Sequence, residues 1–409
     1  MNKEQRVLIL ETIKENGWLV GDWTEDIWNR IITGIFDYRT KQIISGFCDA
    51  HCHLDRCYTF SPEYLPTSID PSKIADLPLK AKQDLIGQLH DGRAYTSASL
   101  RKRMELHVQK LIRIGTREVW AAVDTTPDIG LRAFNEATRL KEKYAGQIDI
   151  KVSAYPIFGL KDPKTNPDRL NTLIEASKKA DFILGLPEKD DTPSRVGFEQ
   201  HVSILLDLAY KNKIEVQIHV DQENSGFQED SFRTLNCIQS LLPEKFDWFT
   251  KSDTPKLWLV HVISPSCYDH VKFSKLLDLI LKFNVGVIIC PVAALSMRTL
   301  RSETSPIHNS IARVIEMMKA GVNIRIGTDN VNDILVPSGD GLVLTEIKVL
   351  SNIVRNYSPH IFAKIASGID LNDGDRHILA QALHESRKAC EKHQSKIDAI
   401  NNTQNTIEF

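Results

Sequence analysis

The residues with the most evident chemistry form the run Asp49-Ala50-His51-Cys52-His53-Leu54-Asp55-Arg56. Side chains alternate across an extended strand, so His51 and His53 share one face and Cys52 takes the other. Two imidazoles at the end of a strand make half of a metal site, because neutral histidine is a common ligand of divalent metals. The rest of the chain has to supply the other half.

Further candidate ligands stand where other apolar, β-type segments end. They are His219, His261 and Asp329, which close the fifth, sixth and eighth predicted strands. A lone histidine is usually a structural residue, and Asp329 alone could cap the next helix. Their joint placement is the stronger signal, because unrelated structural residues have no reason to gather at the ends of strands.

The combined set predicts a centre for one divalent metal ion. Its predicted ligands are His51, His53, His219 and Asp329. Imidazole and carboxylate suit Zn²⁺, the ion we expect, and also Fe²⁺ or Mn²⁺. A metal lowers the pKa of a bound water toward neutrality and so provides hydroxide as a nucleophile. His261 would then hold or polarise the substrate, or bind a second metal.

The elements that must position these residues alternate between strand and helix. Eight runs are predicted as strands: 43–49, 118–124, 148–155, 182–187, 215–219, 257–261, 286–291 and 323–329. Helical patterns lie between several of them, at 100–114, 131–144, 198–211 and 311–320. Strands buried on both faces and separated by helices predict an α/β fold, a (β/α)8 TIM barrel. Active sites of such barrels form at the carboxyl ends of the strands, where the candidate ligands stand.

Three segments fall outside the alternation. Residues 1–42 are predicted as a helical N-terminal segment with an aromatic-rich part, and 346–409 as a helical C-terminal extension with a polar, frayed end from Asn401. The connection 58–98 is too long for a routine link and is expected to form a binding loop or lid. We therefore predict one domain over 1–409, with the barrel at about 43–345.

Composition narrows the class of protein. The chain has 409 residues, 42% hydrophobic and 25% charged, with a net charge of -2. These values are typical of a globular protein and give no reason to expect nucleic acid or a membrane surface as partner. We expect a small-molecule substrate instead. Seven cysteines without a Cys-x-x-Cys pair, and a first segment unlike a signal peptide, predict reduced thiols and a cytoplasmic location.

On these residues the chain resembles the amidohydrolase superfamily of metal-dependent barrels, and within it the cytosine deaminase-like branch. The resemblance covers about 46–344 and rests on His51 to Asp55, His219-Val220-Asp221, His261, Pro291-Val292, Gly327 to Asp333 and Pro337-Ser338-Gly339. It implies one catalytic metal on the four predicted ligands. It also implies that Asp329 takes the proton from attacking water and that His261 supports the water or the tetrahedral intermediate. The implied reaction is hydrolysis at a carbon that bears nitrogen.

Departures from that branch bear on the substrate and on the ends of the chain. Gln222 stands where the branch has a proton-shuttling glutamate, and an amide cannot titrate. Ile157 stands where enzymes of the branch have a glutamine that binds the pyrimidine substrate, so we expect a more apolar pocket. Asn330 replaces a second carboxylate that often follows the metal-binding aspartate. Neither terminus shows the small β-sandwich of many relatives, so the termini are expected to shape the entrance or the interface of a homo-oligomer.

Further side chains are candidates for contact with the substrate. The predicted substrate contacts are Ile157, Glu188, Asn330 and Arg298. The Arg298 guanidinium would meet an anionic group, although a surface position is equally compatible with the sequence. Lys189 would bridge two metals if it were carboxylated, but a solvated loop residue is the better interpretation. Asp124 either points into the pocket or caps a helix, and Asp55 is expected to orient a ligand histidine or the loop that follows.

The sequence predicts a hydrolase that cleaves an amide-like or ring C–N bond, with Asp329 as base, His261 stabilising charge and Gln222 in the shuttle position. Gln222 favours this reaction, because protonating a ring nitrogen is the step that needs the missing glutamate. An aminohydrolase of a heterocyclic amine related to cytosine is the alternative. A phosphotriester or lactone hydrolase and a non-catalytic metal-binding barrel are lesser alternatives.

Overall fold

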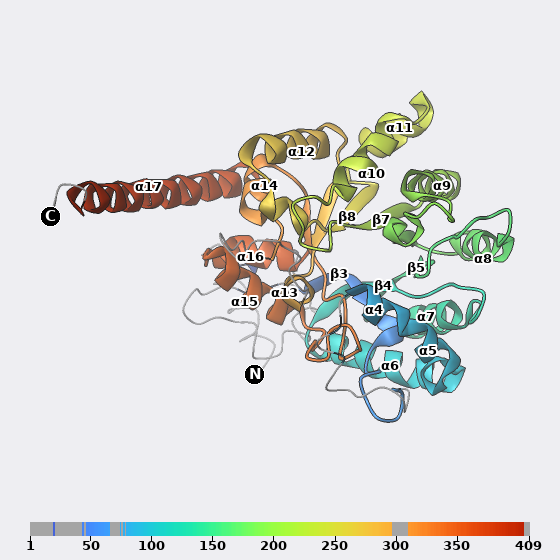
Figure 1. The fold of residues 1–409 in the computed structure, drawn as a ribbon. Helices are drawn as coiled ribbons and strands as arrows, with labels where there is room; N and C mark the ends of the chain where they lie inside the picture. The colour runs from blue at the N-terminus through green and yellow to red at the C-terminus, as the bar shows by residue number, and fades with distance from the viewer. Residues whose placement is uncertain are drawn as a thin grey trace, which may run out of the picture.

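Eight parallel strands among the described residues form a nearly closed barrel, and helices flank it (Figure 1). The computed structural model describes residues 19–20, 43–44, 46–65, 74, 77, 79–296 and 310–404. The strands, hydrogen-bonded in chain order, are β3 (Phe47–His53), β4 (Thr116–Ala122), β5 (Asp149–Ala154), β6 (Phe182–Gly185), β7 (Glu215–Val220), β8 (Leu257–His261), β9 (Gly286–Ile289) and β10 (Ile324–Ile326). The predicted (β/α)8 TIM barrel is therefore confirmed.

The barrel closes where its first strand meets its last. The backbone N–H of Asp329 donates to the carbonyl of His51, and the N–H of His53 donates to the carbonyl of Asp329, both at 2.7 Å. The Asp49 carboxylate adds bonds from the backbone N–H of Thr328 at 3.0 Å and from its hydroxyl at 2.7 Å. This closure joins the histidine pair to the aspartate that the sequence predicts as its partner.

Helices lie between the barrel strands and after the last of them. They are α4 (Leu79–Asp84), α5 (Ile86–Asp91), α6 (Ser97–Arg113), α7 (Arg132–Lys143), α8 (Pro167–Ser177), α9 (Phe198–Asn212), α10 (Asp230–Gln239), α11 (Pro243–Thr250), α12 (His270–Lys282), α13 (Pro291–Ser296), α14 (Val314–Ala320), α15 (Val343–Val354), α16 (Pro359–Ala366) and α17 (Asp373–Gln404). Short 3-10 turns are η1 (Leu54–Arg56), η2 (Arg93–Tyr95), η3 (Pro187–Asp190) and η4 (Ser264–Cys267).

The amphipathic helices pack because their apolar residues recur at helical spacing. In α7, the side chains of Ala133, Phe134, Ala137 and Leu140 are buried, and the helix contacts β5. The strands that they cover are buried on both faces, as every residue of β3 and β8 shows. The barrel is thus a packed core whose strand ends are available for a site.

The predicted strand 43–49 is wrong in its extent, because it is two strands. Gly46 separates β2 (Ile43–Ile44) from β3 with a φ of 128°, a conformation that other residues rarely adopt. β2 pairs with β1 (Leu19–Val20) in a separate two-stranded sheet, so this part of the predicted helical segment is extended. The rest of the predicted N-terminal segment lies outside the described residues.

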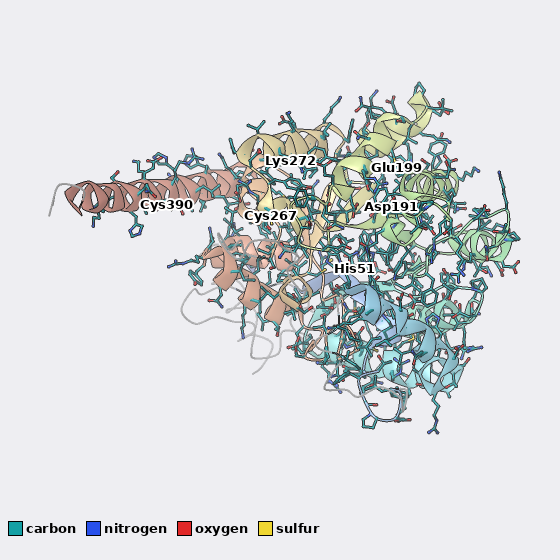
Figure 2. The ribbon with its side chains drawn as sticks, viewed as in Figure 1. His51, Asp191, Glu199, Cys267, Lys272 and Cys390 are labelled. Atoms are coloured by element: carbon teal, nitrogen blue, oxygen red, sulfur yellow. The ribbon has the colours of Figure 1, made fainter. Side chains whose placement is uncertain are left out.

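The two other irregular segments contain helices among the described residues. The long connection 58–98, which is predicted as a binding loop or lid, contains α4, α5 and η2. The predicted helical C-terminal part consists of α15, α16 and α17, but α17 continues past Asn401 to Gln404. Its outer part, which carries Cys390, projects away from the barrel (Figures 1 and 2). Among the described residues, we find no helix with the length and hydrophobicity that a bilayer crossing demands.

Candidate metal centre and active site

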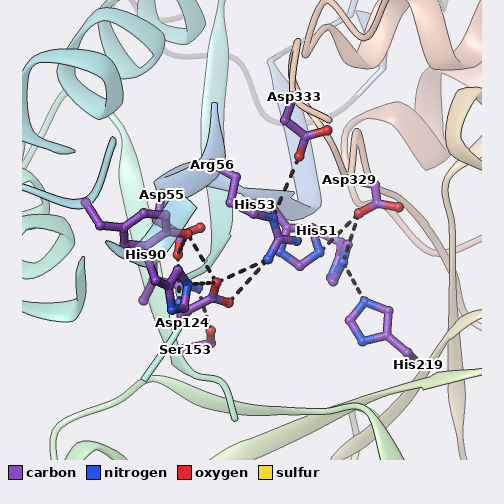
Figure 3. Close-up of polar contacts among 12 residues, drawn as sticks. His51, His53, Asp55, Arg56, His90, Asp124, Ser153, His219, Asp329 and Asp333 are labelled. Atoms are coloured by element: carbon purple, nitrogen blue, oxygen red, sulfur yellow. Dashed lines mark hydrogen bonds and ion pairs between the residues drawn. The ribbon is translucent and has the colours of Figure 1, made fainter. Parts of the chain in front are cut away.

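Five of the predicted site residues, four histidines and one aspartate, lie together inside one end of the barrel. His51 and His53 come from β3, His219 from β7 and His261 from β8, and Asp329 follows β10. Each is at most 4% exposed. Figure 3 shows His51, His53, His219 and Asp329 pointing toward one another. Strand alternation explains this, because residues two apart on β3 face the same side of the barrel.

Two imidazole nitrogens of this group lie unusually close together. His51 Nε2 and His219 Nε2 are 3.2 Å apart. Asp329 Oδ1 lies 3.1 Å from His53 Nε2 and 3.7 Å from His51 Nε2, while its Oδ2 lies 3.8 Å from His261 Nε2. The carboxylate therefore stands between the histidine pair of β3 and the histidine of β8.

Hydrogen bonds behind the rings fix which nitrogens face the centre. Gln217 donates from Nε2 to the carbonyl of Ala50 at 3.0 Å, so its Oε1, at 2.9 Å, accepts from His51 Nδ1. His219 Nδ1 donates to the carbonyl of Gly185 at 3.1 Å. Both Nε2 atoms then lack a hydrogen, and their lone pairs point at each other in a buried site. A cation between them relieves that repulsion, so the donor set fits a divalent metal.

The electrostatics of the centre also fit a metal. Burial, reinforced by the charge of Arg56, lowers the pKa of His53 to about 3, and burial lowers the pKa of His261 to about 4. Burial and the neighbouring imidazoles hold the pKa of His219 well below its usual value. Burial alone would raise the pKa of Asp329, but the hydrogen bond from His53 and the nearby imidazoles keep it well below its usual range. Neutral imidazoles and an ionised carboxylate are the forms that bind metals.

Two groups of side chains among the described residues have the geometry to hold an ion. One is His51, His53 and His219, and the other is His261, Cys290 and Asp329. Within each group, the candidate ligand atoms lie within 4.8 Å of one another. Cys48, Cys52 and Cys57 form no such group among the described residues, and these thiols are buried.

The backbone at the strand ends adopts conformations that are rare for residues with side chains. Asp221, His261, Val262 and Asp329 have φ values of 55°, 80°, 52° and 58°. Such left-handed residues are strained, and strain of this kind gathers where a site requires a particular side-chain direction. Two of the four are predicted functional residues.

A small cavity of about 20 Å³ lies against this centre. It is lined by His53, Arg56, Leu79, Gln83, Tyr155, Ile157, Leu186, His219, Gln222, His261, Asp329, Asn330 and Leu335. Leu79 and Gln83 belong to α4, so the long connection 58–98 provides one wall of the pocket. The cavity has room for about one water molecule.

The predicted substrate contacts divide into three cases. Ile157 and Asn330 line the cavity, as does the predicted catalytic Gln222. Gln222 Nε2 and Asn330 Oδ1 are buried without a hydrogen-bond partner. Glu188 is not among the lining residues, although its Oε1 is also buried and unpartnered, and burial with Asp230 nearby raises its pKa to about 7. Arg298 lies outside the described residues.

The expectations for two carboxylates beside the site have different outcomes. Asp55 contacts no ligand histidine, but it holds the connection that follows β3, because its Oδ2 accepts from the Tyr95 hydroxyl at 3.1 Å and from the Asp124 backbone at 2.8 Å. The expectation for Asp124 is wrong. Asp124 neither caps a helix nor lines the cavity. It accepts from Arg56 Nη1 at 3.3 Å and lies 3.1 Å from His90 Nε2, as the dashed lines in Figure 3 show. Both carboxylates compensate buried cations. Lys189, the weaker candidate for a metal bridge, lies 3.3 Å from Asp84 Oδ1.

Several residues of the site were not predicted from the sequence. Arg56 is buried, lines the cavity and lies 3.7 Å from Asp333 through its Nε. Tyr155 stacks at 5.7 Å from His53 and 5.6 Å from His219, between ring centroids. Gln217 could have been found, because it stands two residues before His219 and so on the same strand face. Gln83 carries no comparable signal.

Comparisons with known proteins agree with this architecture. No protein family model matches the chain. The chain is 22% identical over 309 residues to N-isopropylammelide isopropyl amidohydrolase of Pseudomonas sp. (strain ADP), covering 75% of this chain and 67% of that protein. It is 23% identical over 273 residues to an uncharacterized protein of Haemophilus influenzae, covering 67% and 90%.

Solved structures extend the comparison to the fold. The 5-methylcytosine deaminase of Klebsiella pneumoniae liganded with 5-fluorocytosine superposes with a TM-score of 0.66 and 21% identity, over 83% of this chain and 75% of that one. The N-isopropylammelide isopropylaminohydrolase of Burkholderia multivorans gives 0.60 and 18%, over 78% and 72%. The predicted resemblance to the cytosine deaminase-like amidohydrolases is confirmed. At these identities the shared property is the fold, and the reaction has to be argued from the site.

Proposed function

We propose that this protein is a metal-dependent hydrolase that cleaves a C–N bond in a small, cyclic, nitrogen-containing substrate. The observation that carries the proposal is the pair of Nε2 atoms of His51 and His219, 3.2 Å apart with both Nδ1 hydrogens already engaged. His53 and Asp329 complete the proposed ligand set. Zn²⁺ is the proposed ion, and Fe²⁺ or Mn²⁺ suits the same donors.

The chain's own residues account for the steps around the metal. When bound, the ion supplies the Lewis acidity that activates water for attack on an electrophilic carbon. Asp329, kept ionised, accepts the proton of the attacking water. His261, near Asp329 Oδ2, stabilises the negative charge that develops on the substrate. Gln222 orients the substrate through its free amide, which cannot carry a proton.

The cavity lining favours a polar, uncharged or anionic substrate. Three carboxamides and one guanidinium line it: Gln83, Gln222, Asn330 and Arg56. Carboxamides both donate and accept, so they complement a ring or amide that carries N–H next to C=O. The buried Arg56 charge disfavours a cationic substrate. Ile157 supplies an apolar contact. Glu188 stays a predicted contact although it is not in the lining, and Arg298, which lies outside the described residues, also stays a predicted contact.

Deamination is the second candidate, and the similar proteins favour it. A 5-methylcytosine deaminase and N-isopropylammelide hydrolases are named for the loss of an amine from a heterocycle. Gln222 favours the first candidate, since an amide cannot deliver a proton to a ring nitrogen. The two reactions give different products, so a single assay separates them.

The experiment is a substrate panel with metal content measured by elemental analysis. The purified protein is assayed against aminated heterocycles, cyclic amides and cyclic ureas, with ammonia or amine release and ring opening followed separately. We expect turnover that disappears after chelation and returns with Zn²⁺. Turnover that survives complete metal removal, or a panel without any turnover by metal-loaded protein, contradicts the proposal.

The variant Gln222→Glu sharpens the choice between the two reactions. If the enzyme opens rings or cleaves amides, a titratable group at this position changes the rate by less than about 10-fold. If it is a deaminase that works poorly for want of a proton shuttle, ammonia release rises by about 100-fold or more. Gln222→Leu serves as the control for a change of packing alone.

A further inference from the structure

We propose that the outer part of α17 is a dimerisation helix, which pairs antiparallel with α17 of a second copy of this chain. The proposal goes beyond the proposed function, because the pairing involves no residue of the metal centre. A dimer of this kind has two-fold symmetry, so each copy contributes the same surface. The tip of each helix would lie in a groove at the base of the other.

The length of α17 exceeds the part that the barrel covers. The helix has 32 residues, Asp373–Gln404, and so spans about 48 Å. Its first part packs on α14, and Leu379 there is fully buried. From His384 to Lys396 every residue is exposed, and this part projects away from the barrel (Figures 1 and 2). Helices in proteins gain most of their stability from a packed face, so we expect a partner for the projecting part.

The residues that pack on α14 begin a heptad pattern that continues beyond the barrel. The pattern has alternating steps of four and three residues, and its described members are Leu379, Leu383, Ser386, Cys390 and His393. The sequence continues these steps at Ile397 and Ile400. Steps of four and three place side chains in one stripe, as at the seam of a coiled coil. This stripe is buried where it meets the barrel and exposed from Ser386 to His393.

Charges on the projecting part make it depend on packing. Lys388, Lys392 and Lys396 follow one another at steps of four, and like charges at this spacing destabilise a helix. Lys388 and Lys392 lie away from the stripe, so two paired helices keep them in water. Beside the stripe, antiparallel pairing brings Arg387 near Gln394 of the partner subunit, where the two side chains do not repel each other.

A groove lies where the stripe leaves the barrel. It is a cavity of about 470 Å³ between α12, α14 and α17. Phe273 and Leu277 of α12 line it, and so do Leu383 and Cys390 of the stripe. Apolar side chains therefore stand on both sides of a space that a helix can enter, which is how amphipathic helices dock in grooves.

The packing of α14 decides the direction of the partner helix. A parallel partner would bring its own α14 to the place that α14 already occupies on the stripe. An antiparallel partner brings only the tip of its helix there. With the two-fold axis between the midpoints of the stripes, the layers would be Cys390 with His393, Ser386 with Ile397 and Leu383 with Ile400, one residue from each copy. Two of these layers combine a small side chain with a larger one, and the outermost layer is apolar, as knobs-into-holes packing requires.

Sedimentation velocity of the full-length protein over a dilution series tests the proposal. We expect a species of twice the 46.3 kDa chain mass. Cys390→Lys should raise the Kd of the dimer by about 100-fold or more, because it buries an unpaired charge in two layers. Ser274→Arg should also weaken the dimer, since Ser274 of α12 lines the groove that the partner's tip would enter. Ser395→Lys is the matched control, because it adds the same charge on the far side of the helix and should keep the dimer.

The cysteines allow a second measurement on the unmodified sequence. Cys390 is exposed, and the other six are buried or partly buried. A short bismaleimide should therefore link two chains through Cys390 in the wild type and not in Cys390→Ser. Thermal unfolding shows that each variant is folded.

A monomer throughout the dilution series overturns the proposal, as does a dimer that Cys390→Lys leaves intact. A dimer that survives Ser274→Arg, or that the bismaleimide does not link, overturns the antiparallel arrangement. Metal content and turnover are measured separately, so failure of the dimer leaves the proposed function standing.

Discussion

Two environments of buried histidines lie side by side in this structure, and they differ in how the charge of the imidazole is balanced. In the first, His51 and His219 turn bare Nε2 lone pairs toward each other at 3.2 Å. In the second, His90 places Nδ1 2.5 Å from Asp128 and Nε2 3.1 Å from Asp124. Burial alone would lower the pKa of His90, but the hydrogen bonds with these aspartates raise it to about 9.

The comparison separates a structural histidine from a proposed metal ligand. His90 is protonated and supplies the positive charge that Asp124 and Asp128 require. The imidazoles around His219 are neutral and leave a negative region that needs a cation from outside. Burial is the same in both environments, so the position of the carboxylates decides the role. The predictions below test this difference, from the largest expected effect to the smallest.

The largest effect is expected from His219→Ala. Removing a ligand should abolish stoichiometric metal binding and reduce kcat/KM by about 1,000-fold or more. Elemental analysis and steady-state kinetics on the best panel substrate measure both quantities. His201→Gln is the matched control, because His201 is as buried but pairs with Asp190 at 2.7 Å. Metal retained at the wild-type level in His219→Ala would contradict the ligand role.

Asp124→Asn should do the reverse, lowering stability and sparing the metal. The change leaves the buried Arg56 and His90 without their shared carboxylate, at a cost of about 3 kcal/mol. Urea unfolding of the metal-free protein measures the loss, and elemental analysis should still find the wild-type metal content. If the free energy of unfolding is unchanged within error, Arg56, His90 and Asp124 do not carry the charges described here.

Gln217→Leu tests whether the tautomer of His51 is held from behind. The side chain keeps its volume, but the acceptor for His51 Nδ1 is lost. Metal affinity should fall by about 10- to 100-fold, as it does when such supporting hydrogen bonds are removed. Competition with a chromophoric chelator measures the change. An affinity equal to that of the wild type would mean that His51 is oriented by packing alone.

The smallest effect is a dependence of stability on pH from His90. Its pKa in the folded protein, about 9, lies above the ordinary 6.5, so folding takes up a proton between these values. The stabilisation is complete below pH 6.5 and is lost as pH rises through 9. Urea unfolding between pH 6.5 and 10 follows it, and His90→Gln should flatten the slope. A wild-type slope that persists in His90→Gln assigns the effect to another group.

The sequence predicts the barrel and the meeting of its strand ends well, because both depend on local patterns. Strand periodicity puts His51 and His53 on one face, and the parallel topology brings His219 and Asp329 to the same end. The boundaries at Gly46 and at β10 were predicted less well, since short strands end where backbone geometry changes rather than where hydrophobicity does.

The charged network beside the site could not be predicted in this way. His90 lies in the connection 58–98, where no periodicity indicates which way a side chain faces. The sequence identifies its partner Asp124 only as a carboxylate at the end of a strand. Such a residue can cap a helix or contact the pocket, and the sequence is compatible with both roles. The pairing depends on how α5 packs on the barrel, and that is a property of the tertiary structure.

The closure of the barrel has a consequence for how the protein matures. Asp49 and Thr328, which it joins, stand 279 positions apart in the chain. Contacts between such distant residues form late, because loop-closure entropy has to be offset by structure already in place. During synthesis the histidine pair leaves the ribosome long before its aspartate. The chain would therefore bind the metal at full affinity only after β10 has docked on β3, at the end of folding. A chain that ends before β10 would be inactive as well as unstable.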